Sequence, residues 1–187
     1  NAMIYATEPR RAIQLLHATS LPLKRWVNWL EGWPDAFLDT SNLRNLSQSY
    51  WGSLSAMDFN SPARKALASV RIQDYGCIRE SLILCDLAWP IYTVRQPANF
   101  LGPGQLESQL ISAVTGREMD VAGLFETGER IFNLQRAILM RQGWGGKKRD
   151  TLRGYLFSEP IETAFFNPKL LVPDAAGNPV TRKGAVI

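Results

Sequence analysis

Two residues near the middle of the chain could take part in the chemistry of a site: Glu80 and Cys85, five positions apart. A cysteine thiolate is a soft, charged metal ligand, and a carboxylate accepts hydrogen bonds. The ordinary alternative for a cysteine in an apolar run is a small buried core residue. Five helical steps rotate the chain by about 140°. The two side chains can therefore serve one site only if the chain bends or leaves the helix at Leu82–Leu84.

The pattern before this pair predicts a long helix that delivers it. Ser61 and Pro62 form a helix-start signal, because serine is a good N-cap and proline suits the first helical position. Apolar residues then recur at helical spacing, which predicts a helix over Pro62–Ile78. A second long helix is predicted over Val121–Arg141, in which Gly128 would allow close packing. We expect both helices to lie in the core.

The remaining pattern predicts an all-α domain over residues 1–187. Shorter helices are expected at 9–19, 22–31, 42–59 and 105–114, with a chain break at Leu21–Pro22 and a weak point at Gly52. Strand-like alternation is scarce. Residues 155–187 contain scattered prolines and are expected to be irregular, with a tight turn over 174–179 that could form a small hairpin.

Composition limits the class of protein. The 187 residues are 45% hydrophobic and 20% charged, with a net charge of +4, which are ordinary values for one globular domain or two closely packed helical lobes. No signal peptide is visible, and no apolar run approaches the roughly 20 residues of a membrane helix. A cytoplasmic location is expected.

The only two cysteines, Cys77 and Cys85, are predicted to be reduced and unpaired. On one helix, eight residues would separate them by about 12 Å, which is too far for a disulfide. Two cysteines also cannot complete a zinc or iron–sulfur site.

Four segments resemble the tungsten-containing aldehyde ferredoxin oxidoreductase family. Glu80–Cys85 is similar to its C-terminal motif Asp-x-x-Gly-Leu-Cys, with Glu80 at the acid and Cys85 at the cysteine. The three other matching segments stand in the family's order and at about its spacing: Tyr5–Arg10, Ser112–Asp120 and Gly128–Ala137. The resemblance implies an irregular multi-helix fold like the family's C-terminal helical domains.

The resemblance also implies the cofactors and the roles of three residues. The family binds a tungsten- or molybdenum-bis-pterin and one 4Fe–4S cluster. By analogy, Glu80 contacts the pterin and Cys85 is one of the four cluster ligands. A histidine near the metal falls at Gln14 by direct register, and His17 lies nearly one turn later. His17 is either an ordinary histidine at a helix surface or a proton carrier at the metal.

The implied activity is oxidation of an aldehyde to a carboxylic acid, with ferredoxin or another carrier accepting the electrons one at a time. The other three cluster cysteines and a second acidic motif would lie upstream, so we expect a C-terminal fragment in which Asn1 and Ala2 are a tag remnant. Alone, it should be inactive and bind neither cofactor tightly. The expected partners are the remaining domains of the same chain and, as a possibility, a second copy of it, with no membrane and no nucleic acid.

Two departures leave other functions open. Ile83 stands at the motif's glycine, and isoleucine suits neither close backbone approach nor a positive φ angle. With Gln14, it favours a divergent enzyme or a structural relative that lost its cofactor. A different class is a non-catalytic helical module that binds an acidic partner or nucleic acid. Arg10–Arg11 and Lys147–Arg149 motivate it, and it predicts a contiguous basic face.

Overall fold

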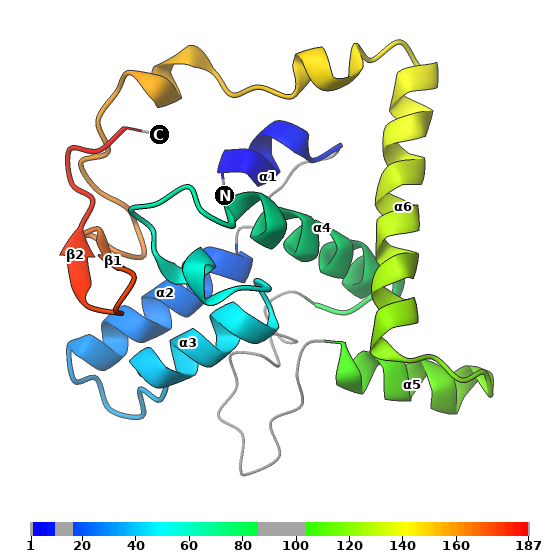
Figure 1. Ribbon diagram of the computed structural model, residues 1–187, viewed down its shortest axis with the longest axis horizontal. Helices are drawn as coiled ribbons and strands as arrows, with labels where there is room; N and C mark the ends of the chain where they lie inside the picture. The colour runs from blue at the N-terminus through cyan, green and yellow to red at the C-terminus, as the bar shows by residue number, and fades with distance from the viewer. Residues whose placement is uncertain (1, 10–16, 86–103, 187) are drawn as a thin grey trace.

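The fold is known from a computed structural model, which describes residues 2–9, 17–85 and 104–186. Helices form nearly all of the regular structure, so the predicted all-α class is confirmed. Figure 1 shows α6 standing along one side of the molecule, with α4 running into it from the centre and α2 and α3 side by side below. The segment after α6 crosses back to a small β-hairpin on the opposite side.

The bounds of the elements follow the chain order. The α-helices are α1 (Ala2–Thr7), α2 (His17–Leu30), α3 (Thr40–Ser49), α4 (Lys65–Ser81), α5 (Gln105–Thr115) and α6 (Val121–Arg141). The 3₁₀ turns are η2 (Leu54–Met57), η4 (Gly146–Arg149) and η5 (Gly154–Phe157), and the hairpin consists of β1 (Leu171–Pro173) and β2 (Pro179–Thr181). Among the described residues, none of these helices combines the length and apolar character needed to cross a bilayer.

Helix α4 is the central element of the core, as predicted. Its Ile72, Tyr75 and Ile78 are buried in one cluster with Trp26 and Trp51. The predicted start was wrong, because the helix begins at Lys65 rather than at Pro62. The reason is local: the hydroxyl of Ser61 accepts a hydrogen bond from the amide of Ala63 (3.1 Å) and so stabilises a turn before the helix.

The contact between α4 and α6 is close because α6 has a glycine at the crossing. A Cβ atom at Gly128 would lie only 2.4 Å from the backbone oxygen of Asp74. The packing role predicted for Gly128 is therefore confirmed. Only part of α6 joins the core, however: Leu124 and Gly128 are buried, whereas Leu134 and Ile138 in the second half are 61% and 47% exposed.

An arginine fastens the second half of α6 to the rest of the domain. The Arg136 guanidinium donates to the carbonyl of Thr7 (2.6 Å) and forms a salt bridge with Asp150 (2.8 Å). It also lies over the ring of Trp144, 4.6 Å from the centroid. This single side chain links α1, α6 and the segment that follows α6.

A proline inside α2 contradicts the predicted chain break at Leu21–Pro22. Pro22 lies within the continuous helix His17–Leu30. Proline lacks an N–H, so it cannot donate to the carbonyl four residues earlier, which belongs to Ala18. The buried indole Nε1 of Trp51 donates to that carbonyl instead, at 3.2 Å. The helix therefore tolerates Pro22 because a distant side chain satisfies the acceptor that the proline leaves open.

Trp51→Phe is expected to reduce the free energy of unfolding by about 1–2 kcal/mol, because the Ala18 carbonyl would be buried without its donor. Chemical denaturation of the chain measures the loss. The control is the double variant with Pro22→Ala, which supplies a new backbone N–H to Ala18. Its combined loss should be smaller than the sum of the two single losses. Strict additivity would contradict this account.

The predicted helix over 42–59 is wrong, because the chain leaves the helix before Gly52. Helix α3 ends at Ser49, Gly52 has φ 83°, and a 3₁₀ turn follows over Leu54–Met57. A positive φ costs glycine little and other residues much. Gly52 therefore ends the helix by its conformation and does not only weaken it.

The small hairpin expected around residues 174–179 is confirmed. Strands β1 and β2 pair antiparallel, with Val172 opposite Val180. Asp174 makes the turn, because its carboxylate accepts hydrogen bonds from the amides of Ala176 (2.9 Å) and Asn178 (2.8 Å). These bonds hold the pKa of Asp174 below its usual value.

Candidate functional site

The two residues singled out by the sequence lie at the C-terminal end of α4, where the chain leaves the helix. The amide of Ile83 donates to the carbonyl of Glu80 (3.1 Å), and the amide of Leu84 donates to that of Arg79 (2.9 Å). Together these are the two hydrogen bonds of a Schellman C-cap. The bend expected at Leu82–Leu84 is therefore confirmed, and it carries Cys85 away from the helix axis.

The turn requires one residue with a positive φ angle, and that residue is Ile83, with φ 57°. Glycine normally takes this place in a Schellman cap because it has no Cβ. The expectation that isoleucine would not take a positive φ here is therefore wrong: Ile83 adopts this conformation, with the strain that a β-branched residue carries there. The side chain gains nothing by burial, because it is 92% exposed.

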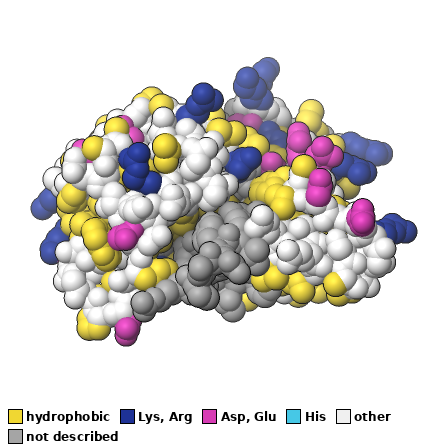
Figure 2. Space-filling view, turned by 60° about the horizontal axis from the view of Figure 1, so that its bottom comes forward, with side chains coloured by type: hydrophobic (Ala, Val, Ile, Leu, Met, Phe, Trp, Pro, Cys, Tyr) yellow, Lys and Arg dark blue, Asp and Glu magenta, His cyan; other side chains and the backbone are white. Residues whose placement is uncertain are grey.

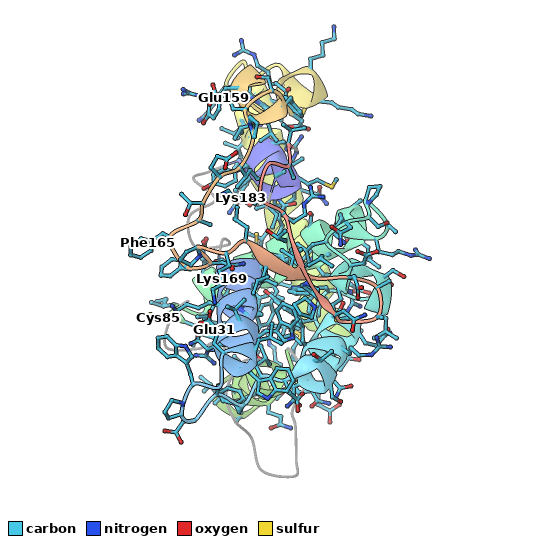
Figure 3. The ribbon with its side chains drawn as sticks, turned by 90° about the vertical axis from the view of Figure 1, so that its left-hand side faces the viewer. Glu31, Cys85, Glu159, Phe165, Lys169 and Lys183 are labelled. Atoms are coloured by element: carbon cyan, nitrogen blue, oxygen red, sulfur yellow. The ribbon has the colours of Figure 1, made fainter. Side chains whose placement is uncertain are left out.

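Cys85 is exposed, so the alternative that it is an ordinary core residue is wrong. Cys77 is the buried cysteine, within α4, and both cysteines are free of disulfides as predicted. Figure 3 shows Cys85 at the outer edge of the domain in that view. The thiol of Cys85 is thus exposed just beyond the end of α4, whereas that of Cys77 lies in the core.

A buried set of polar side chains lies next to the C-terminal part of α4. The guanidinium of Arg79 lies over the ring of Tyr75, 5.2 Å from the centroid, and the Tyr75 hydroxyl donates to the carboxylate of Glu107. Arg79 is 2% exposed and Glu107 is 1% exposed. Through these residues, α5 supports the helix end that precedes Glu80, which is itself half-buried. Sequence reasoning missed this group, because partners 32 residues apart leave no spacing pattern.

The other predicted site residues lie at the margin of the described part. His17 is the first residue of α2, but its side chain is outside what the structure describes, as are Gln14 and Arg10–Arg11. The role of His17 stays a prediction.

A buried carboxyl group lies in the middle of α4, where this helix crosses α6. Asp74 is 9% exposed, and burial, together with the nearby charge of Glu129, raises the pKa of its carboxyl to about 6 against a smaller opposing effect of Arg71. Two acidic groups thus meet where Gly128 brings the helices together.

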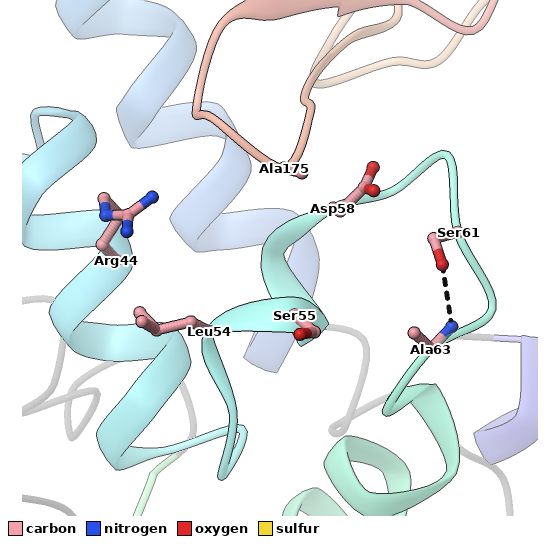
Figure 4. Close-up of a pocket in the computed structure, with 7 residues that line it drawn as sticks. All are labelled: Arg44, Leu54, Ser55, Asp58, Ser61, Ala63 and Ala175. Carbon is pink, nitrogen blue, oxygen red and sulfur yellow. Dashed lines mark hydrogen bonds between the residues drawn. The ribbon is translucent and has the colours of Figure 1, made fainter.

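A cleft of about 200 Å³ lies at the other end of α4 (Figure 4). Its lining combines a guanidinium, a carboxylate and hydroxyl groups: Arg44, Leu54, Ser55, Asp58, Ser61, Ala63 and Ala175. Because α4 has 17 residues, about 25 Å of helix separates this cleft from Glu80. The cleft is thus a separate feature from the Glu80–Cys85 turn.

The distribution of charge does not follow the pattern that a nucleic-acid module would need on the face in Figure 2. Lys and Arg side chains stand apart there, with Asp and Glu side chains among them. A contiguous basic face would concentrate positive potential in one place. The view in Figure 2 therefore gives no support to that alternative.

By its fold and by the turn after α4, the protein is an irregular all-α domain with an exposed thiol just beyond the end of its central helix. The family model for aldehyde ferredoxin oxidoreductase, domains 2 & 3, matches residues 2–171. The chain therefore belongs to the aldehyde ferredoxin oxidoreductase family of oxidoreductases, and the resemblance seen in the sequence is confirmed. No solved structure matches the chain.

Members of this family generally use tungsten or molybdenum with a pterin, together with iron and sulfur. Within the described ranges, no group of three or more histidine, cysteine or acidic side chains is placed to hold a metal ion. The described residues supply one of the four thiolate ligands that a 4Fe–4S cluster needs. Cys85 offers one accessible soft ligand, and the remaining ligands would have to come from elsewhere.

Proposed function

We propose that the chain is the C-terminal part of a tungsten- or molybdenum-pterin, iron–sulfur oxidoreductase that oxidises aldehydes to carboxylic acids with ferredoxin as the electron acceptor. Family membership supports the reaction class. The observation that carries the site is the cap of α4, which turns the Cys85 thiol outward five residues after Glu80.

In this proposal Cys85 is a thiolate ligand of the iron–sulfur cluster and Glu80 accepts hydrogen bonds from the pterin. A thiolate suits iron because it is soft and charged. The carboxylate suits the pterin because amine and N–H groups are donors only. When bound, these groups supply two-electron chemistry at the metal and one-electron transfer through the cluster. The chain itself sets the path of the backbone between the two residues through the hydrogen bonds of the turn.

His17 is proposed as the proton carrier, since imidazole titrates near neutral pH. The other cluster ligands would come from the remaining domains of the same polypeptide, because the matched region is the family's second and third domains. We propose residues 1–187 as one helical unit of that larger enzyme, in the cytoplasm. A second copy of the protein is a further proposed partner.

The test compares Cys85→Ala with Cys77→Ala in the full-length enzyme. The two variants remove the same thiol, but Cys77 is buried in α4 and Cys85 is exposed beyond it. Iron and acid-labile sulfide should fall several-fold or be lost in Cys85→Ala and stay at the wild-type level in Cys77→Ala. Glu80→Gln should lower the tungsten or molybdenum content with less effect on iron. Unchanged iron and sulfide in Cys85→Ala would overturn the ligand assignment.

A further inference from the structure

A concentration of positive charge lies where α6 ends and the chain turns back over the domain. Figure 1 places this stretch along one outer edge of the domain, and Figure 3 shows Glu159, shortly after the stretch, at the same edge. All of its basic side chains are exposed, and together they form the basic edge: Arg141, Lys147, Lys148, Arg149 and Arg153.

The only carboxylate between residues 141 and 153 does not neutralise these cations. It belongs to Asp150, which accepts hydrogen bonds from both terminal nitrogens of Arg136, at 2.8 Å and 3.3 Å. In the ranges that the structure describes, no salt bridge involves a residue of the basic edge. Uncompensated like charges repel one another, and a negatively charged partner surface would remove that repulsion.

The basic turn η4 is fixed at both of its ends by one arginine. The Arg136 guanidinium lies over the ring of Trp144, before the turn, and binds Asp150, directly after it. Between them, the amide of Asp150 donates to the carbonyl of Lys147 (3.1 Å). The basic side chains of η4 therefore start from a backbone that is ordered before any partner arrives, which reduces the entropic cost of binding.

Exposed apolar side chains lie next to the basic edge. Met140 is 59% exposed, and its methyl group would lie 4.0 Å from a Cβ at Gly146 in η4. In η5, Tyr155 and Phe157 are 49% and 50% exposed. Arginine, methionine and aromatic residues are enriched where proteins bind each other. This edge thus combines the composition of a protein-binding surface with a positive charge.

We propose that this edge of the domain docks an acidic protein, whose carboxylates face the basic edge and whose apolar groups cover Met140, Tyr155 and Phe157. Nucleic acid fits less well, because its binding sites need cations that follow the backbone over many phosphates. Here three of the five cations are consecutive in one short turn. The inference is independent of the role proposed for Cys85, so either can fail without the other.

The experiment measures the binding of two fluorescein-labelled peptides to the full-length protein by fluorescence anisotropy. One peptide contains glutamates interspersed with leucines, and the other, of equal length, contains only glutamates. Wild type should bind the mixed peptide more tightly, and its affinity should fall as sodium chloride is added, because salt screens exposed charges.

Two triple variants with the same net charge separate a local site from a general charge effect. The first reverses the three charges of η4: Lys147→Glu, Lys148→Glu and Arg149→Glu. The second reverses three exposed arginines elsewhere: Arg64→Glu, Arg117→Glu and Arg130→Glu. The first should weaken binding of the mixed peptide by about tenfold or more, and the second should bind close to wild type. Equal losses in the two variants would overturn the inference, because net charge alone would then explain the binding.

Met140→Ser tests the apolar part of the surface. It should weaken binding of the mixed peptide and leave binding of the all-glutamate peptide unchanged, because it removes an apolar contact and no charge. Thermal unfolding checks that each variant keeps the wild-type Tm. If the charge-reversal variant of η4 does not fold, Lys147→Gln with Lys148→Gln replaces it and should weaken binding by a smaller factor. Tighter binding of an oligothymidylate, or of phosphatidylglycerol vesicles, than of the mixed peptide would overturn the inference in favour of nucleic acid or a membrane.

Discussion

Gly128→Ala should reduce the free energy of unfolding by about 2–3 kcal/mol, although alanine is the better helix former. A Cβ at this position would lie 2.4 Å from the backbone oxygen of Asp74 and 2.9 Å from its carbonyl carbon. Backbone cannot move aside as a flexible side chain can, so the helices must separate at their crossing. The cost of such overpacking exceeds the gain of about 1 kcal/mol in helix propensity.

The measurement is the thermal unfolding of the chain, in which this loss corresponds to a fall in Tm of about 4–12 °C. The matched control is Gly123→Ala on the same helix. There a Cβ would meet only the side-chain ends of Asp120, at 3.1 Å, and Met119, at 3.4 Å. This control should change Tm far less. Equal effects of the two substitutions would show that the closeness of α4 and α6 is not what makes Gly128 necessary.

Asp74→Asn should stabilise the chain by about 2–3 kcal/mol at pH 7–8 and have little effect below pH 4. The pKa of Asp74 is raised from 3.8 to about 6, chiefly by burial and then by Glu129. The folded state therefore binds a proton that the unfolded state has released between these two values. Stability falls as the pH rises from about 4 to 6, and above that the whole penalty is present.

Urea denaturation of wild type and Asp74→Asn at pH values from 4 to 8 measures this difference. Other acidic groups titrate in both proteins, so their contributions cancel in the comparison. Glu129→Gln is the second variant, because removing the neighbouring charge should lower the pKa of Asp74 and make the pH effect smaller. A constant difference between wild type and Asp74→Asn over the whole range would refute the raised pKa.

Sequence patterns predicted those elements whose cause is local. The hairpin follows from the turn residues at 174–179, and the apolar spacing of α4 and α6 follows from helix periodicity. Gly128 was correctly assigned to packing for the same reason, since a glycine inside a long helix has a steric purpose. These predictions needed no knowledge of distant partners.

One failure involves a contact between distant segments. Pro22 reads as a break, and it is accommodated because Trp51 donates to the Ala18 carbonyl. No pattern within a short window contains such information. The other failure is local: Ser61–Pro62 reads as a helix start, but the Ser61 hydroxyl accepts a hydrogen bond from the Ala63 amide in a turn, and the helix begins only at Lys65.

The candidate site was found through resemblance to a family rather than through spacing alone. Glu80 and Cys85 form an unremarkable pair in the sequence, and only the match of several ordered segments gave them a meaning. The left-handed conformation of Ile83 was beyond prediction, because residue type argues against it. The buried contact between Tyr75 and Glu107 was likewise invisible, since it depends on how α5 meets α4.

The angle between α4 and α6 at their crossing also affects the position of the end of α4. Seven residues, or about 10 Å of helix, separate Asp74 at the crossing from Ser81 at the end of α4. A tilt of about 5° at the crossing would displace that end, with Ile83 and Cys85 beyond it, by about 1 Å. Groups that must meet another surface in register tolerate little more than half of that. The absence of a Cβ at Gly128, by allowing this close crossing, thus contributes to where the end of α4 lies relative to α6.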